Sequence, residues 1–94
     1  MKKICIEEVK KHTTIYSCWI IANGYVYDVT DFLDKHPGAM DTDIILKKAG
    51  MDCSIDYKFH SKKTQKVWRK YRIGKLKNWK INKLVKKTSK ISLN

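Results

Sequence analysis

Two strand-like runs on either side of Asn23-Gly24 constrain the fold of this chain more than any other feature. The runs are IYSCWII (15–21) and YVYDVT (25–30), and both are rich in Ile, Val, Tyr and Trp, residue types that favour strands. Asn-Gly between two such runs is a strong signal for a tight β-hairpin. The chain is therefore expected to fold around an antiparallel hairpin.

Short helical and strand patterns surround this hairpin. Short strands are expected over 3–6 and 72–76, and short helices over 6–12, 31–36, 40–50, 51–60 and 61–71. Thr30 or Asp31 is expected to cap the second of these helices, since short polar side chains favour helix starts. Asp52 or Ser54 is expected to cap the fourth, and Gly50 to end the third. A small sheet with several short helices predicts the α+β class.

The length of the chain points to a bound group. With 94 residues, it forms one small domain that buries only about two thirds of its surface, and such domains often need a metal or cofactor for stability. No run approaches the roughly 18 apolar residues of a membrane span. The N-terminus has lysines but no long apolar segment, so no signal peptide is expected. We expect a soluble, cytoplasmic monomer.

The cysteines exclude several kinds of site. Cys5, Cys18 and Cys53 are far apart and form no C-x-x-C pair, which argues against a zinc knuckle or a thioredoxin-like site. The absence of C-x-x-C-H argues against covalently attached haem. We expect three free thiols that are buried or inert, as in a reducing compartment.

The charge divides the chain into two unlike halves. Residues 1–56 carry seven lysines and nine acids, a net charge of −2, whereas residues 57–94 carry fourteen Lys or Arg and no acid. Such asymmetry suggests an anionic partner for one face. The organisation predicted from this is a globular domain over 1–76 and a basic tail over 77–94.

Two histidines stand at the ends of predicted helices. His36 ends one and His60 another, and the 23 residues between them are expected to form helix, glycine turn and helix. Two such arms create a cleft with a histidine at each lip. Its expected lining is apolar or aromatic: Phe32, Leu33, Ile45, Ile55, Phe59, Val67, Tyr71 and Ile73. Apolar walls and two opposed imidazoles suit haem, whereas zinc needs four protein ligands. From residue types alone, the alternative to haem ligation is that His36 and His60 are structural or merely exposed.

The order of short motifs narrows these choices. WIIANGYVYDVTDFLDKHPG, then AGMD, FHS and YRIGKL, resembles the cytochrome b5 family over residues 4–76. The resemblance implies a small mixed sheet with short helices that form a haem cleft. It also implies a noncovalent b-type haem whose axial ligands are His36 and His60. His12 falls outside this ligand set and is expected at the surface or at a helix end.

The resemblance also implies the surroundings of the haem. Ser61 is expected to reach a propionate, and Pro37-Gly38 to turn the chain so that His36 faces the iron. The full expected haem-contacting set is Phe32, Pro37, Gly38, Ile45, Ile55, Phe59, Ser61, Val67, Tyr71 and Ile73. The sequence departs from the family pattern at Ala39, where a second glycine is usual. Compared with the family pattern, the segment from Ala39 to Lys48 is about two residues longer. The segment from Met51 to Phe59 is about two residues shorter.

Two axial protein ligands leave no open iron position, so the expected function is one-electron transfer rather than enzymatic catalysis. The expected partner is a reductase or oxidase, and lysines beside the acids favour a mixed or basic docking face. Alternatives are a haem sensor or carrier, and a haem-free basic module for nucleic acid or membrane surfaces. No nucleic-acid motif is present. Ile81, Leu84 and Val85 follow helical spacing, so the tail is either a helix on an anionic membrane or a solvated segment.

Overall fold

The computed structural model describes residues 1–35 and 40–79. Its strands are β1 (Lys3–Ile4), β2 (Thr13–Thr14), β3 (Ser17–Ala22), β4 (Tyr25–Asp28) and β5 (Arg72–Leu76). Its helices are α1 (Ile6–Val9), α2 (Thr30–Lys35), α3 (Met40–Lys47), α4 (Ser54–Phe59) and α5 (Lys62–Arg69). These elements confirm the α+β class.

The strands form one mixed sheet in the order β1-β5-β4-β3-β2. β1 pairs with β5 in parallel, and the other pairs are antiparallel. The expected hairpin joins β3 to β4, and Asn23 and Gly24 have φ values of 50° and 81°, as a type I′ turn requires. The short strand β2 was not predicted, because Thr13 and Thr14 are exposed and carry no apolar alternation.

Alternation along β3 sends its side chains to two core clusters. The first contains Cys18, Ile20, Ala22, Tyr27, Val29, Leu33 and Cys53. The second contains Ile4, Val9, Ile21, Val26 and Leu76. Successive residues of a strand point to opposite faces, so the sheet lies between the two clusters. The first cluster is the one against which the helices after β4 pack.

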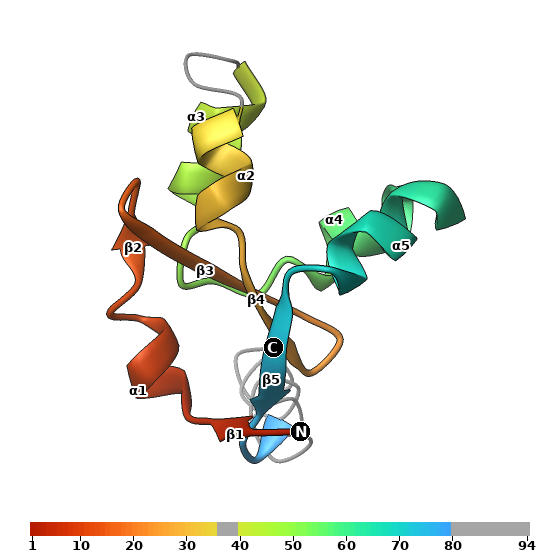
Figure 1. Ribbon diagram of the computed structural model, residues 1–94. Coiled ribbons are helices and arrows are strands. Elements are labelled where there is room, and N and C mark those ends of the chain that lie inside the picture. Colours follow the sequence, from red (N-terminus) through yellow and green to blue (C-terminus); the bar gives the residue numbers. More distant parts are fainter. Residues whose placement is uncertain (36–39, 80–94) are drawn as a thin grey trace, which may run out of the picture.

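Two helical arms project from the sheet (Figure 1). The first arm consists of α2 and α3, and the second consists of α4 and α5. Between the arms, the chain passes beside β3, where Ile21 N–H donates to Met51 O and Cys53 N–H to Ile21 O. Gly50 ends the first arm as predicted, and its φ of 76° favours glycine.

Both arms are fixed to β3 by the same arrangement of hydrogen bonds. Asp28 Oδ1 accepts from the N–H and hydroxyl of Thr30, at 3.1 and 2.5 Å, and Thr30 Oγ1 accepts from Cys18 N–H. In the second arm, Asp52 Oδ1 accepts from the N–H and hydroxyl of Ser54, at 2.8 and 2.5 Å.

Ser54 Oγ then accepts from Asn23 N–H, just as the Thr30 hydroxyl accepts from β3 in the first arm. The prediction that Asp52 or Ser54 caps α4 is wrong, because the N-cap is Cys53 and its side chain makes no capping bond, although Asp52 does accept from the first N–H of the helix. The prediction for the first arm is wrong in its residue. Asp28 rather than Thr30 or Asp31 holds the start of α2, because the Thr30 oxygen is already bonded to the strand.

The cysteines and His12 have structural surroundings. Cys18 and Cys53 are buried as expected, whereas Cys5 is exposed. Burial is the main cause that raises the pKa of Cys18 to about 11 and that of Cys53 to about 12. His12 is half-buried, stacks on Trp19 at 3.6 Å between ring centroids, and bonds to Glu8 and Ser17. Its ring therefore joins α1 to β3 rather than standing free at the surface.

Candidate functional site: the end of the second helical arm

The site is centred on His60, which lies in the corner between α4 and α5. Its backbone N–H donates to Tyr57 O and ends α4. The next residue, Ser61, begins α5 by accepting a hydrogen bond from Thr64 N–H at 3.2 Å. Because one helix stops and the next starts at adjacent residues, the backbone direction at His60 is fixed from both sides.

Gln65 provides a second constraint on this corner. Its side-chain Nε2 donates to two carbonyl oxygens, Tyr57 O at 3.0 Å and His60 O at 3.1 Å. Both carbonyls lie at the C-terminal end of α4, where carbonyls lack the usual helical donors, and Tyr57 O accepts from Gln65 in addition to His60 N–H. Sequence patterns gave no sign of this role, because a glutamine one turn into a helix usually faces solvent.

The His60 ring lies beside an aromatic side chain. It lies 5.6 Å from the Trp68 ring, between centroids, and Trp68 also makes edge contacts with Tyr27 and Tyr57. Among residues 1–35 and 40–79, no hydrogen bond to a ring nitrogen of His60 is recorded, and the residue is exposed. An imidazole held in this way can accept a metal at a nitrogen.

Exposed apolar side chains lie in the same helical arm as this imidazole. Phe59 is 82% exposed, Ile55 72% and Val67 40%. Exposed groups of this size on so small a domain indicate a surface that binds an apolar partner or ligand. All three belong to the predicted haem-contacting set, and all three lie in the second arm.

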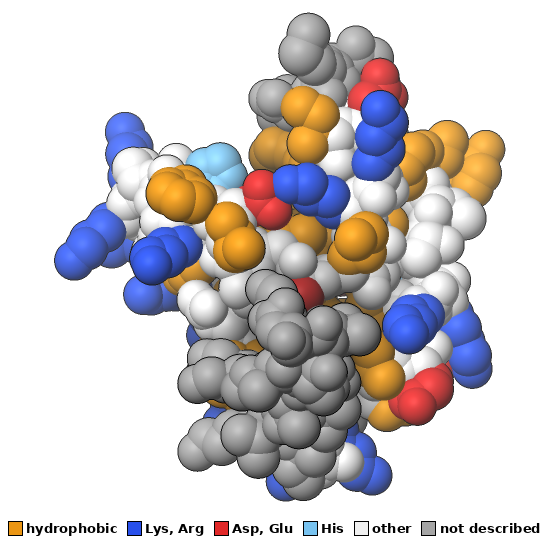
Figure 2. Space-filling view, turned by 180° about the vertical axis from the view of Figure 1, so that it is seen from behind, with side chains coloured by type: hydrophobic (Ala, Val, Ile, Leu, Met, Phe, Trp, Pro, Cys, Tyr) orange, Lys and Arg blue, Asp and Glu red, His pale blue; other side chains and the backbone are white. Residues whose placement is uncertain are grey.

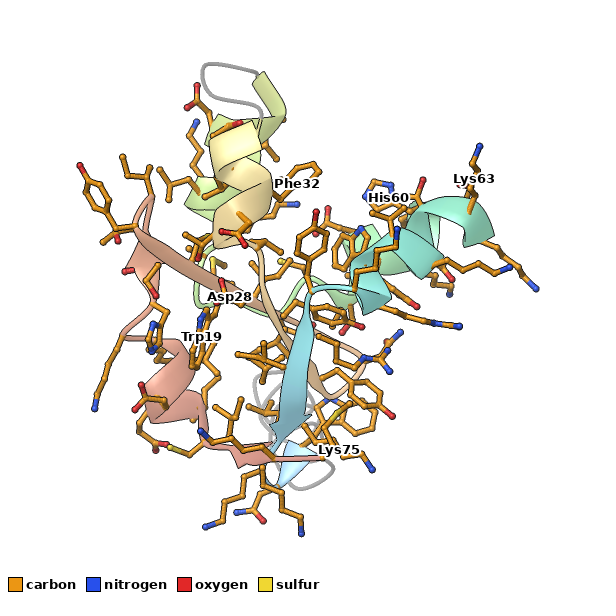
Figure 3. The ribbon with its side chains drawn as sticks, viewed as in Figure 1. Trp19, Asp28, Phe32, His60, Lys63 and Lys75 are labelled. Carbon is orange, nitrogen blue, oxygen red and sulfur yellow. The ribbon has the colours of Figure 1, made fainter. Side chains whose placement is uncertain are left out.

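The first arm approaches the site through Phe32. Figure 3 shows Phe32 and His60 on the sides of the two arms that face each other. The Phe32 ring makes an edge contact with Tyr71, 6.1 Å between centroids, and Ile45 packs with both against the first core cluster. Phe32, Ile45 and Tyr71 are thus half-buried members of the predicted set that also support the core.

Two of the predicted wall residues, Ile73 and Leu33, pack against the core clusters. Ile73 is not brought to this surface: it packs against the second core cluster. The pairing shifts between Val26↔Gly74 and Tyr27↔Arg72, so Ile73 is an unpaired extra residue that turns away from the arms. Leu33 is buried in the first cluster rather than exposed to a ligand. His36, Pro37 and Gly38 lie outside the described residues.

One ion pair connects the bases of the two arms. Lys48, which follows α3, lies 2.5 Å from the Asp56 carboxylate of α4. This hydrogen bond is the main cause that raises the pKa of Lys48. Both side chains are about two-fifths exposed, so the pair adds little stability.

The comparisons with known proteins agree with this geometry. A family model described as cytochrome b5-like heme/steroid binding domain matches residues 6–77. The chain belongs to the cytochrome b5 family. Cytochrome b5 of Ostreococcus tauri virus 2 superposes with a TM-score of 0.65 at 32% identity, over 78% of this chain and 94% of that one. Cytochrome b558 of Ectothiorhodospira vacuolata gives 0.68 at 26% identity, over 81% and 99%.

Similar curated sequences are far longer than this chain. Two plant nitrate reductases of Arabidopsis thaliana are 47% and 49% identical over 76 residues. That match covers 80% of this chain but only 8% of each enzyme. The chain thus spans about a twelfth of the length of these relatives.

Membership of the family gives the cofactor and the general role. The cofactor of this cytochrome b5 domain is a noncovalent b-type haem, and the domain transfers electrons. The described residues fit that cofactor, because an exposed histidine lies in the same helical arm as three exposed apolar side chains. In the described part of the chain, no helix is long and apolar enough to cross a membrane.

Proposed function

We propose that this domain carries single electrons through a haem whose two axial ligands are His60 and His36. The observation that supports the proposal most is the setting of His60, an exposed residue whose ring packs on Trp68 and which lies in the same arm as the exposed side chains of Phe59 and Val67. His36 is the next residue in the chain after α2, the helix that carries Phe32 toward the second arm.

Two imidazoles fill both axial positions of a haem iron. The haem then accepts and releases one electron, with no open position for oxygen or substrate. The helix ends on either side of His60 and the side chain of Gln65 hold this proposed axial ligand in place. The partner in this proposal is a reductase or oxidase, either a separate protein or another domain.

Single histidine substitutions test the ligand assignment. His60→Ala and His36→Ala are each expected to open one axial position, so the dithionite-reduced protein should bind carbon monoxide and change its visible spectrum. His12→Ala is the matched control, since His12 bonds to Glu8 and Ser17 away from this site. The proposal is wrong if either ligand variant keeps the unaltered spectrum and still ignores carbon monoxide.

A further inference from the structure

The outward face of α5 is covered by cations. Every Lys and Arg of this helix is exposed, as is the lysine that follows it. We call this surface the basic face of α5; it consists of Lys62, Lys63, Lys66, Arg69 and Lys70. Figure 2 shows Lys and Arg side chains gathered on the second arm with apolar side chains between them.

These cations have no carboxylate partners in the part of the chain that the structure describes. The ion pairs recorded there are Glu8 with Lys11 and His12, and Lys48 with Asp56. Lys66 lies four residues from both Lys62 and Lys70, a spacing at which like charges repel and destabilise a helix. Lys66 and Arg69 lie in the last turn, where cations favour a helix, but Lys62 and Lys63 lie in the first turn, where they do not. A role in binding therefore explains the charge of the whole face better than the folding of α5 does.

The basic face borders the proposed haem site. Lys63 and Lys70 lie four residues before and three residues after Val67, so they are its neighbours on the helix surface. Val67 is 40% exposed, and α5 itself begins two residues after His60. Lys63 extends from the outer end of the second arm (Figure 3). A charged partner that binds here is brought beside the haem rather than to a distant surface.

We propose that the basic face of α5 is the docking surface for an acidic redox protein that exchanges electrons with the haem. This inference rests on the proposed electron-carrier function and names the partner chemistry for that site. A surface lined by one sign of charge raises the encounter rate with oppositely charged proteins. An anionic membrane or a nucleic acid also attracts cations, but neither needs them beside a redox centre.

Electron-transfer rates with two probe proteins test the proposal on the full chain loaded with haem. Reduced flavodoxin, an acidic protein, gives one electron to the ferric haem; its flavin becomes the semiquinone and the haem becomes ferrous. Ferric cytochrome c, a basic protein, takes one electron from the ferrous haem. Stopped-flow rate constants are measured for both at increasing ionic strength. The flavodoxin rate is expected to fall by about tenfold or more with salt, and the cytochrome c rate is expected not to fall.

Two charge-matched double variants locate the effect. Lys63→Glu with Lys70→Glu is expected to lower the low-salt flavodoxin rate by about tenfold. Lys3→Glu with Lys10→Glu produces the same change of net charge at exposed positions in β1 and after α1, and should lower the rate less than about twofold. Equal effects of the two pairs overturn the proposal, because net charge alone then explains them.

Two further outcomes also overturn it. One is a flavodoxin rate that salt does not change. The other is an unchanged flavodoxin rate in the α5 variant together with lost binding to phosphatidylserine vesicles or to single-stranded DNA, which assigns the surface to a membrane or nucleic acid. Each variant is first checked for an intact haem spectrum. A missing haem spectrum in the unaltered protein contradicts the electron-carrier function itself, so the two failures are distinguishable.

Discussion

The two helical arms are attached to β3 in the same way but are stabilised differently. In each, an aspartate holds a hydroxyl residue two positions later, and that hydroxyl accepts an N–H from the β3 region. The first arm then inserts Leu33 into the core, whereas α4 and α5 bury no residue completely. The second arm depends on half-buried aromatic rings and exposes the apolar groups expected to meet the haem. Both arms thus contribute to the predicted site, but only the first also places a fully buried side chain in the core.

Truncation of one apolar side chain in each arm should separate these roles. Leu33→Ala is expected to lower the free energy of unfolding of the haem-free protein by about 2–5 kcal/mol, because it leaves a cavity in the core. Val67→Ala should lower it by less than about 1 kcal/mol, since Val67 is 40% exposed, but should accelerate haem loss to apomyoglobin. Urea denaturation and haem-transfer kinetics measure the two effects. Equal losses of haem-free stability would remove the distinction between the arms.

Substitution of the two anchoring aspartates sharpens the same comparison. Asp28→Ala is expected to cost about 1–2 kcal/mol of unfolding free energy and Asp52→Ala about 0.5–1 kcal/mol. The first value is larger because the Asp28 hydrogen bonds are partly buried and those of Asp52 are exposed. Urea denaturation curves give both values. Asp→Asn at either position keeps the acceptor oxygen and should recover most of the loss; failure of both to do so contradicts the hydrogen-bond explanation.

Removal of the Gln65 amide should affect the site more than the fold. Gln65→Leu removes the side-chain N–H donor that the carbonyls of Tyr57 and His60 share. The corner that positions His60 therefore becomes less fixed. We expect haem loss to apomyoglobin to become a few-fold faster, with a change in unfolding free energy of about 1 kcal/mol or less. Lys66→Ala, an exposed change at the next position, is the control and should leave haem loss unchanged. No acceleration in Gln65→Leu shows that the clamp does not position the histidine.

The buried thiols predict a loss of stability at alkaline pH. The pKa values of Cys18 and Cys53 are raised to about 11 and about 12, from 9.0, chiefly by burial. Between pH 9.0 and the raised pKa of each thiol, the unfolded chain has released a thiol proton that the folded chain retains. The free energy of unfolding therefore falls as pH rises through this range. Urea denaturation from pH 8 to pH 11 should show this decline. The decline of unfolding free energy with pH should be shallower in Cys53→Ala than in the unaltered protein. The same slope in both proteins would show that other groups cause the decline.

The sequence allowed prediction of those features that depend on local signals. Asn23-Gly24 predicted the hairpin, Gly50 predicted the end of the first arm, and the motifs around the two histidines predicted the family. The starts of the helices were harder. Thr30 and Asp31 are both good capping residues, but Thr30 is bonded to Cys18 across the sheet, and that partner is remote in sequence.

Positions in the site that depend on long-range packing were predicted less well. Ile73 appeared equivalent to other apolar wall residues, yet a shift in the pairing of β4 with β5 places it against the second core cluster. Gln65 was missed because its two acceptors are backbone carbonyls, which carry no residue-specific signal. His12 was expected at the surface or at a helix end, and its contacts with Trp19, Glu8 and Ser17 were not predicted.

The visible spectrum of the haem-loaded, unaltered protein tests the central claim most directly. It should be recorded in the ferric state, after reduction by dithionite, and again under carbon monoxide. We expect a sharp Soret band that shifts on reduction, with resolved α and β bands that carbon monoxide does not change, because two histidines occupy both axial positions. A reduced protein whose spectrum changes under carbon monoxide contradicts the claim, since an open axial position means that His36 and His60 do not both ligate the iron.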